Sequence, residues 1–264
     1  MSKVSSGASD PGALRINAGE IGGWPILRIS YPTDRDRIAA LLPPGIEPAD
    51  TADVHLSIYN VPVSDEPEYG VVIKIDASHR GVKGSYAVAY GIDQESAVYI
   101  SKETNGQPKF LAEIEYFRNG DVVRARCMHH GYTFIEFAGR TTGPAPLPGE
   151  FTDREYWIKV SRAVGFAEKS YDFPPHVVLV KADYRPVHRE QVTGELRLLE
   201  SPWDPIASLL PIRGPIRAAL TLDQSLDRSI TLAGPLDPDA FWPHVDTIGS
   251  SRWPGTRGGP KRSA

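Results

Sequence analysis

Residues 110–128 read FLAEIEYFRNGDVVRARCM, and their pattern sets the class of fold. Asn119-Gly120 is a dipeptide that two-residue hairpin turns favour, and strand-forming residues flank it on both sides. After the turn, Arg124 and Arg126 alternate with apolar residues, which puts both arginines on one face of the second strand. The stretch therefore predicts two antiparallel strands joined by a tight turn, with these arginines on the outer face.

Short runs of the same kind recur along most of the chain. β-Branched and aromatic residues between turn formers predict strands over 24–31, 54–61, 71–77, 86–90, 132–137, 177–184 and 195–199. Thr33 is expected to cap a helix that runs through Leu42, and short helices are expected over 205–210 and 237–245. Residues 151–167 fit either a strand or a helix. Many antiparallel strands with few helices predict an α+β, mainly antiparallel β fold, as a barrel or a sandwich with a few peripheral helices.

Length and composition bound the organisation of the chain. Its 264 residues predict one domain over 20–248, preceded by a mobile segment at 1–19 and followed by a tail at 249–264. The net charge of −4 disfavours nucleic acid as a partner, and no run approaches the ~18 apolar residues of a membrane span. The single cysteine, Cys127, cannot form an intrachain disulfide, and the first residues lack the apolar core of a secretory signal. We therefore expect a cytoplasmic protein.

Familiar cofactor and metal motifs are missing from the sequence. It contains no glycine-rich dinucleotide or phosphate loop and no G-x-S-x-G elbow. His129 and His130 follow Cys127 closely, but neighbouring residues of a strand point to opposite faces, so the two histidines are not expected to share a metal ion. We expect neither a metal nor an organic cofactor.

Lys109 differs from most of the other lysines because it lies between a turn and an apolar strand. Pro108 restricts the backbone before it, and Phe110 and Leu111 follow it. Apolar neighbours would remove water from the ammonium group, which disfavours the charged amine and lowers its pKa. A neutral amine can attack a ketone and form a Schiff base. The alternative is a lysine whose ammonium group simply reaches solvent at the start of a strand.

Three segments, in this order, resemble the acetoacetate decarboxylase superfamily. Residues 81–86 read GVKGSY, residues 102–109 read KETNGQPK, and residues 201–211 read SPWDPIASLLP. In that family a G-x-x-G-x-Y strand precedes a motif that ends in Pro-Lys, and an S-P-x-D-P segment follows. The resemblance covers roughly residues 24–233. It implies the β-barrel or cone of the family, a homo-oligomer, and Lys109 as the lysine that forms the Schiff base.

The chain departs from the decarboxylase pattern around this lysine. Decarboxylases carry a second lysine directly after the first, where this chain has Phe110. Their first-strand arginine aligns with Trp24, and two pocket glutamates align with Ser57 and Gly70. The resemblance therefore implies that the groups serving the acetoacetate carboxylate are missing while Lys109 is retained. Without a second cation, only desolvation by Phe110 and the pocket walls would keep the amine neutral.

A divergent branch of the superfamily has other residues at these positions. That branch is associated with pyruvate aldolase–dehydratase and 2-oxo-acid hydratase chemistry. It places a tyrosine beside the lost glutamate and a polar residue four positions before the lysine, which match Tyr69 and Asn105 here. The resemblance implies Tyr69 as a catalytic proton relay and Asn105 as a hydrogen-bond partner of the substrate. The alternatives are a tyrosine that packs on a rim and an asparagine that serves only a turn.

Four further residues are candidates for the substrate pocket. Gln107 and Glu103 precede the lysine and could bind substrate or orient the loop, and Trp24 and Phe110 could line the pocket. Each has a plain alternative, which is a solvated loop side chain for the polar pair and a core or rim aromatic for the other two.

The preferred function is a Schiff-base-forming lyase that acts on 2-oxo acids. Lys109 would condense with pyruvate or an unsaturated 2-oxo acid, because the iminium draws electrons from the neighbouring carbon. The enamine would then add to an aldehyde and lose water, or water would add to the conjugated iminium. The implied partners are small 2-oxo acids with aldehydes or enoates. Two alternatives stay open, an acetoacetate decarboxylase proper and a small-ligand-binding barrel without turnover.

Overall fold

The computed structural model describes residues 24–63, 66–165, 167–247 and 253, and they form a mainly antiparallel β-structure. The strands are β1 (Ile26–Pro32), β2 (Glu47–Pro48), β3 (Asp53–Val63), β4 (Glu66–His79), β5 (Val82–Ile92), β6 (Lys109–Leu111), β7 (Glu113–Asn119), β8 (Val122–His129), β9 (Tyr132–Pro144), β10 (Phe151–Arg162), β11 (Tyr171–Leu198) and β12 (Arg217–Pro235). The helices are α1 (Arg35–Leu41), α2 (Glu95–Asn105), α3 (Ile206–Leu209) and α4 (Pro238–Phe241), with a 3₁₀ turn over Trp242–Thr247. The predicted fold class is confirmed.

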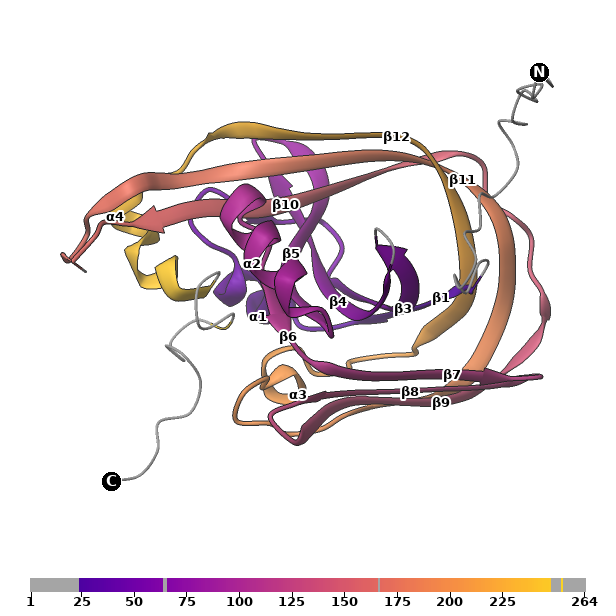
Figure 1. Ribbon diagram of the computed structural model, residues 1–264. Coiled ribbons are helices and arrows are strands. Elements are labelled where there is room, and N and C mark those ends of the chain that lie inside the picture. Colours follow the sequence, from indigo (N-terminus) through magenta and orange to yellow (C-terminus); the bar gives the residue numbers. More distant parts are fainter. Residues whose placement is uncertain (1–23, 64–65, 166, 248–252, 254–264) are drawn as a thin grey trace, which may run out of the picture.

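Seven of the strands close into a barrel. The sheet runs in the order β10-β5-β4-β3-β1-β12-β11-β9-β8-β7, and β10 also pairs with β11. That extra pairing joins the first strand of this order to the seventh. β11 has 28 residues, and its first half pairs with β10 while its second half pairs with β9. One long strand therefore belongs both to the barrel and to the β9-β8-β7 layer (Figure 1).

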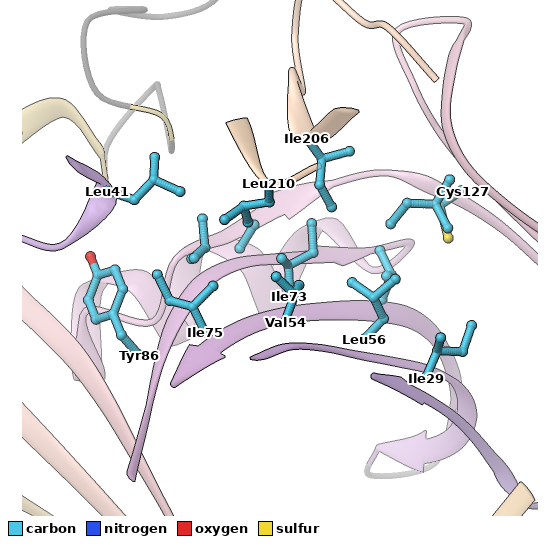
Figure 2. Close-up of a cluster of buried hydrophobic side chains, with 14 of the residues drawn as sticks. Ile29, Leu41, Val54, Leu56, Ile73, Ile75, Tyr86, Cys127, Ile206 and Leu210 are labelled. Carbon is cyan, nitrogen blue, oxygen red and sulfur yellow. The ribbon is translucent and has the colours of Figure 1, made fainter. Parts of the chain in front are cut away.

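The hydrophobic core lies on one face of the barrel strands, between them and the β7-β8-β9 layer. Figure 2 shows Ile29, Leu56 and Ile73 on this face, with Cys127 and Ile206 meeting them from β8 and α3. All five are buried. Burying such an aliphatic side chain contributes about 1.5–3 kcal/mol, so this face accounts for much of the driving force for folding.

Three segments differ from the sequence-based expectation. α1 begins at Arg35 with Asp34 as its N-cap, because the Thr33 hydroxyl instead donates to the carbonyl of Pro211 at 2.7 Å. Residues 151–162 of the ambiguous segment form strand β10. The predicted mobile segment 1–19 and most of the predicted tail lie outside the described residues. Trp253, within that tail, is buried and donates its indole N–H to Asp204.

The sequence pattern predicts neither strand β12 nor helix α2. Val98 is its one buried residue, and Tyr99 and Ile100 are each 65% exposed, so the helix lacks the apolar stripe that reveals most surface helices. Within the described residues, none of the helices is long and apolar enough to cross a membrane.

Gly106 ends α2 and leads the chain into β6. Its φ of 69° is left-handed, and its N–H donates to the carbonyl of Lys102 at 2.9 Å. A Cβ at this position would lie 2.2 Å from the carbonyl oxygen of Ile158 in β10. Glycine is therefore required both by the backbone conformation and by the close approach of β10, and this turn fixes where Lys109 begins the next strand.

We expect Gly106→Ala to lower the free energy of unfolding by about 2–4 kcal/mol, because a left-handed alanine and an overpacked contact act together. Gly120→Ala is the matched control: its φ of 58° is also left-handed, but a Cβ there meets no atom within 4 Å. It should cost only about 1 kcal/mol. Urea unfolding of both variants measures the difference, and equal losses would contradict the role of the Ile158 contact.

Candidate active site

The barrel strands carry polar side chains on the face opposite the hydrophobic core. On β4, Lys74 lies on this face, and its ammonium group is 2.8 Å from Asp153 and 3.4 Å from Glu155. Both carboxylates belong to β10, and β5 lies between the two strands in the sheet order. Side chains on non-adjacent strands can meet in this way only on the concave side of the sheet. The polar face is therefore the inside of the barrel.

Lys109 reaches the same interior from β6. β6 pairs in parallel with β5 so that Lys109 lies beside Tyr90, and only 10% of the lysine side chain is exposed. Its amine nitrogen Nζ lies 3.3 Å from Oε2 of Glu68. The other carboxylate oxygen of Glu68 accepts a hydrogen bond of 2.8 Å from the Tyr59 hydroxyl. Lys109, Glu68 and Tyr59 thus form one buried, hydrogen-bonded group.

This group combines a possible nucleophile with a proton acceptor. The Lys109 amine is the possible nucleophile, and the Glu68 carboxylate lies 3.3 Å from it, within reach of its proton. Burial, together with the charge of Glu68, raises the pKa of Tyr59 well above its ordinary value, so the phenol stays neutral and donates to the carboxylate. Glu68 can therefore exchange a proton with Lys109 over one hydrogen bond while Tyr59 fixes its orientation.

Lys74 is a second buried lysine with different surroundings. Burial acts to lower the pKa of Lys74, but the carboxylates of Glu155 and Asp153 outweigh it and raise the pKa above its ordinary value. Glu155 in turn accepts hydrogen bonds from Tyr90 and from the indole of Trp157. Lys74 is thus held as an ammonium ion by two carboxylates, which makes it a poor nucleophile next to Lys109.

A cavity of about 450 Å³ opens inside the barrel beside these groups. Every barrel strand contributes to its wall, and Arg28, Ser57, Lys74, Asp153 and Arg189 are among the lining residues. Lys109 itself is not among the residues that line the cavity. The volume is within the range of sites that enclose small molecules.

Three of the sequence-predicted residues lie on the core side of the strands. Phe110 packs against His129, with ring centroids 4.9 Å apart, and Trp24 packs edge-on against Tyr116. The Tyr69 ring packs against the main core. Because side chains alternate along a strand, Phe110 faces away from Lys109 and Tyr69 faces away from Glu68. The structure therefore does not bring Tyr69, Phe110 or Trp24 to the amine, which corrects the expectation that Phe110 lies at the amine and helps to desolvate it.

The residues before the lysine are divided between α2 and the following turn. Glu103 is exposed on α2, and its carbonyl accepts a hydrogen bond from Lys159. Asn105 is the last residue of α2, so the Asn-Gly pair ends a helix instead of forming a hairpin turn. Gln107 is buried two residues before Lys109. Only Gln107 of these three is both buried and close to Lys109 in the chain.

Glu68 and Arg28 are the interior residues that sequence comparison missed. The family glutamate was expected at Gly70, but the Tyr59 ring fills the space there, and a Cβ on Gly70 would lie 2.3 Å from it. Glu68 lies two residues earlier on the same face of β4. Arg28 lines the cavity from β1 and contacts Ser57 at 3.5 Å. The aligned positions Trp24, Ser57 and Gly70 hold no arginine or glutamate, but the interior has an arginine and a glutamate elsewhere, at Arg28 and Glu68.

The histidine pair is explained by packing. His129 is buried, and its Nδ1 lies 2.7 Å from Oδ2 of Asp204, the aspartate of the S-P-x-D-P segment. The His130 ring lies against Trp203 of the same segment, with centroids 4.3 Å apart. Among the described residues, there is no group of three or more His, Cys, Asp or Glu side chains that could hold a metal ion.

Known proteins share this architecture. An acetoacetate decarboxylase from Legionella pneumophila superposes with a TM-score of 0.66 at 17% identity, over 86% of this chain and 93% of that one. An acetoacetate decarboxylase-like enzyme from Sphingomonas wittichii RW1 gives 0.61 at 17% identity, over 80% and 91%. The enduracididine biosynthesis enzyme MppR, bound to the condensation product of pyruvate and imidazole 4-carboxaldehyde, gives 0.59 at 16% identity, over 80% and 86%.

These similarities in structure agree with the sequence. No curated protein sequence matches the chain. The family model described as acetoacetate decarboxylase matches residues 9–227, which is most of the chain and includes Lys109, Glu68 and the barrel strands up to the first part of β12. The chain belongs to the acetoacetate decarboxylase family.

Proposed function

We propose that the protein is a lyase in which Lys109 forms a Schiff base with a 2-oxo acid. The observation that carries this proposal is the buried contact of 3.3 Å between the Lys109 amine and the Glu68 carboxylate inside the barrel. A buried amine with an adjacent proton acceptor is the arrangement that imine formation needs. Lys74 is a weaker candidate, because two carboxylates hold it as an ammonium ion.

The reaction follows from the iminium. The neutral amine of Lys109 adds to the C2 carbonyl carbon, and the resulting carbinolamine loses water to give the iminium. The iminium accepts electrons as C3 gives up a proton, which forms an enamine. The enamine adds to an aldehyde, water is lost from the adduct, and hydrolysis releases a conjugated 2-oxo acid and the free lysine.

In the hydratase direction, water adds to the conjugated iminium of a 2-oxo-3-enoate. The iminium is itself the electron acceptor, so these steps need no cofactor.

The structural neighbours favour pyruvate chemistry as the first choice. MppR has been solved with pyruvate and with a condensation product of pyruvate and an aldehyde. Its fold is similar to that of this chain. Small 2-oxo acids with aldehydes or enoates are therefore the proposed substrates. The homo-oligomer and the cytoplasmic location expected from the sequence stay predictions.

Decarboxylation of acetoacetate is the second candidate. Glu68 beside the lysine and Arg28 in the cavity wall supply a carboxylate and a cation of the kinds that the sequence comparison had counted as lost. The same iminium would accept the electrons of the breaking carbon–carboxylate bond as carbon dioxide leaves. A barrel that binds ligands without turnover is the remaining alternative.

Reduction with borohydride in the presence of pyruvate tests the nucleophile. We expect one stoichiometric adduct that maps to Lys109 by mass spectrometry and is absent from Lys109→Ala. Lys83→Ala is the matched control, because that lysine is 74% exposed and should leave the adduct unchanged. An adduct on Lys74, or one retained at full stoichiometry in Lys109→Ala, would refute the assignment. A protein that traps no oxo acid would favour the binding barrel.

The reaction itself is tested by supplying pyruvate with an aromatic or unsaturated aldehyde. The product should be a conjugated 2-oxo acid with a strong near-ultraviolet absorption band, and it should not form with Lys109→Ala. Acetoacetate should release carbon dioxide slowly or not at all. If acetoacetate is decarboxylated efficiently and no aldol product forms, the second candidate is the correct one.

Glu68→Gln tests the role of the carboxylate. An amide cannot accept a proton from the Lys109 amine, so the rate of imine trapping should fall about 100-fold, as is typical for loss of a general base. Glu195→Gln, an exposed glutamate on β11, is the control. Equal trapping rates for wild type and Glu68→Gln would show that the carboxylate takes no part in proton transfer at the amine.

A further inference from the structure

One arginine of the cavity has no role in the proposed reaction. Arg189 lies on β11 and is half-buried. It lines the cavity of about 450 Å³ and also a small adjoining one. Arg28 lines both cavities as well, so the two arginines are shared by the walls of both.

Neighbouring cations in the cavity wall are compensated by acids, whereas Arg189 is not. Arg28 pairs with Asp223 at 3.0 Å, and Lys74 pairs with Asp153 at 2.8 Å. In the part of the chain that the structure describes, no carboxylate lies within ion-pair distance of Arg189. A partly buried guanidinium without an acid loses hydration and gains no partner, so it favours an anion arriving from the cavity.

The cavity also leads toward the proposed nucleophile. Arg28 contacts the hydroxyl of Ser57 in the cavity wall at 3.5 Å. Tyr59 is the next residue on the same face of β3, about 7 Å further along the strand. Tyr59 holds the carboxylate of Glu68, which contacts Lys109. Ser57, which lines the same cavity as Arg189, is therefore one inward-facing residue along β3 from Tyr59.

Resting on the proposed function, we propose that the barrel cavity is a subsite for a carboxylate at the far end of the substrate, and that Arg189 receives it. The substrate class is then a 2-oxo diacid, with its oxo group at Lys109 and its second acid in the cavity. A guanidinium binds a carboxylate through two parallel hydrogen bonds, and one uncompensated cation balances one negative charge. A phosphate dianion would bring excess negative charge close to Asp153 and Asp223.

The test compares borohydride trapping of pyruvate with trapping of 2-oxoglutarate and 2-oxoadipate. In the wild type, half-maximal trapping should need less of at least one diacid than of pyruvate. In Arg189→Gln, the diacid concentration required should rise about tenfold or more, which is typical for loss of a charged hydrogen bond. Pyruvate trapping should not change. Arg197→Gln is the matched control, because Arg197 also lies on β11 but pairs with Glu136 of β9 outside the barrel.

Two results would overturn the subsite. In the first, Arg189→Gln changes the concentration needed for half-maximal trapping equally for pyruvate and for the diacids. In the second, it changes this concentration for none of them. In both cases pyruvate trapped at Lys109 would leave the proposed function standing.

Calorimetry with Lys109→Ala tests the subsite separately from the proposed function, because no imine can form in this variant. Glutarate should bind to this variant and bind about tenfold more weakly when Arg189→Gln is added. Tighter binding of inorganic phosphate than of glutarate would contradict the carboxylate class.

Discussion

The alternation of side chains along β4 is the constraint on which both sides of the barrel wall depend. Val71, Ile73 and Ile75 point to the hydrophobic core, and Glu68 and Lys74 point to the barrel interior. A strand cannot shift by one residue without exchanging these two sets, which would bury the charges in the core and expose the aliphatic groups to the polar interior. The register that assembles the core therefore also assembles the polar interior.

Charged groups inside the barrel are costly, and their arrangement limits that cost. A buried ion pair loses hydration that its mutual attraction only partly returns, so pairs of this kind are weak contributors to stability. Each carboxylate here has further partners, since Glu68 accepts from Tyr59 and Glu155 accepts from Tyr90 and Trp157. A fold held by an aliphatic core has no need of such groups for stability. Their presence on the inward face is consistent with the chemistry proposed for the interior.

The sequence predicted where the strands lie better than it predicted which face of a strand each residue occupies. The Asn119-Gly120 hairpin is present as β7 and β8, and Lys109 begins a buried strand as expected. Matching single positions to a family pattern did not consider which residues of the strand share a face. Tyr69 was therefore preferred to Glu68, its neighbour on the opposite face. The signal was available, because residues 68, 70, 72 and 74 share the face of Lys74. α2 gave no clear signal, since Val98 is its one buried residue and its larger apolar residues Tyr99 and Ile100 are exposed.

The segment that most resembles the family explains the fold more than the reaction. Asp204 is fully buried and accepts hydrogen bonds from His129 and from the indole of Trp253. His129 in turn packs on Phe110, so the S-P-x-D-P segment fastens α3, β8 and β6 to one another on the core side. This role needs no substrate. The S-P-x-D-P segment therefore serves packing on the core face, whereas the proposed chemistry depends on the few inward-facing residues on the other face of the strands. The reaction must accordingly be inferred from Lys109, Glu68 and the cavity wall.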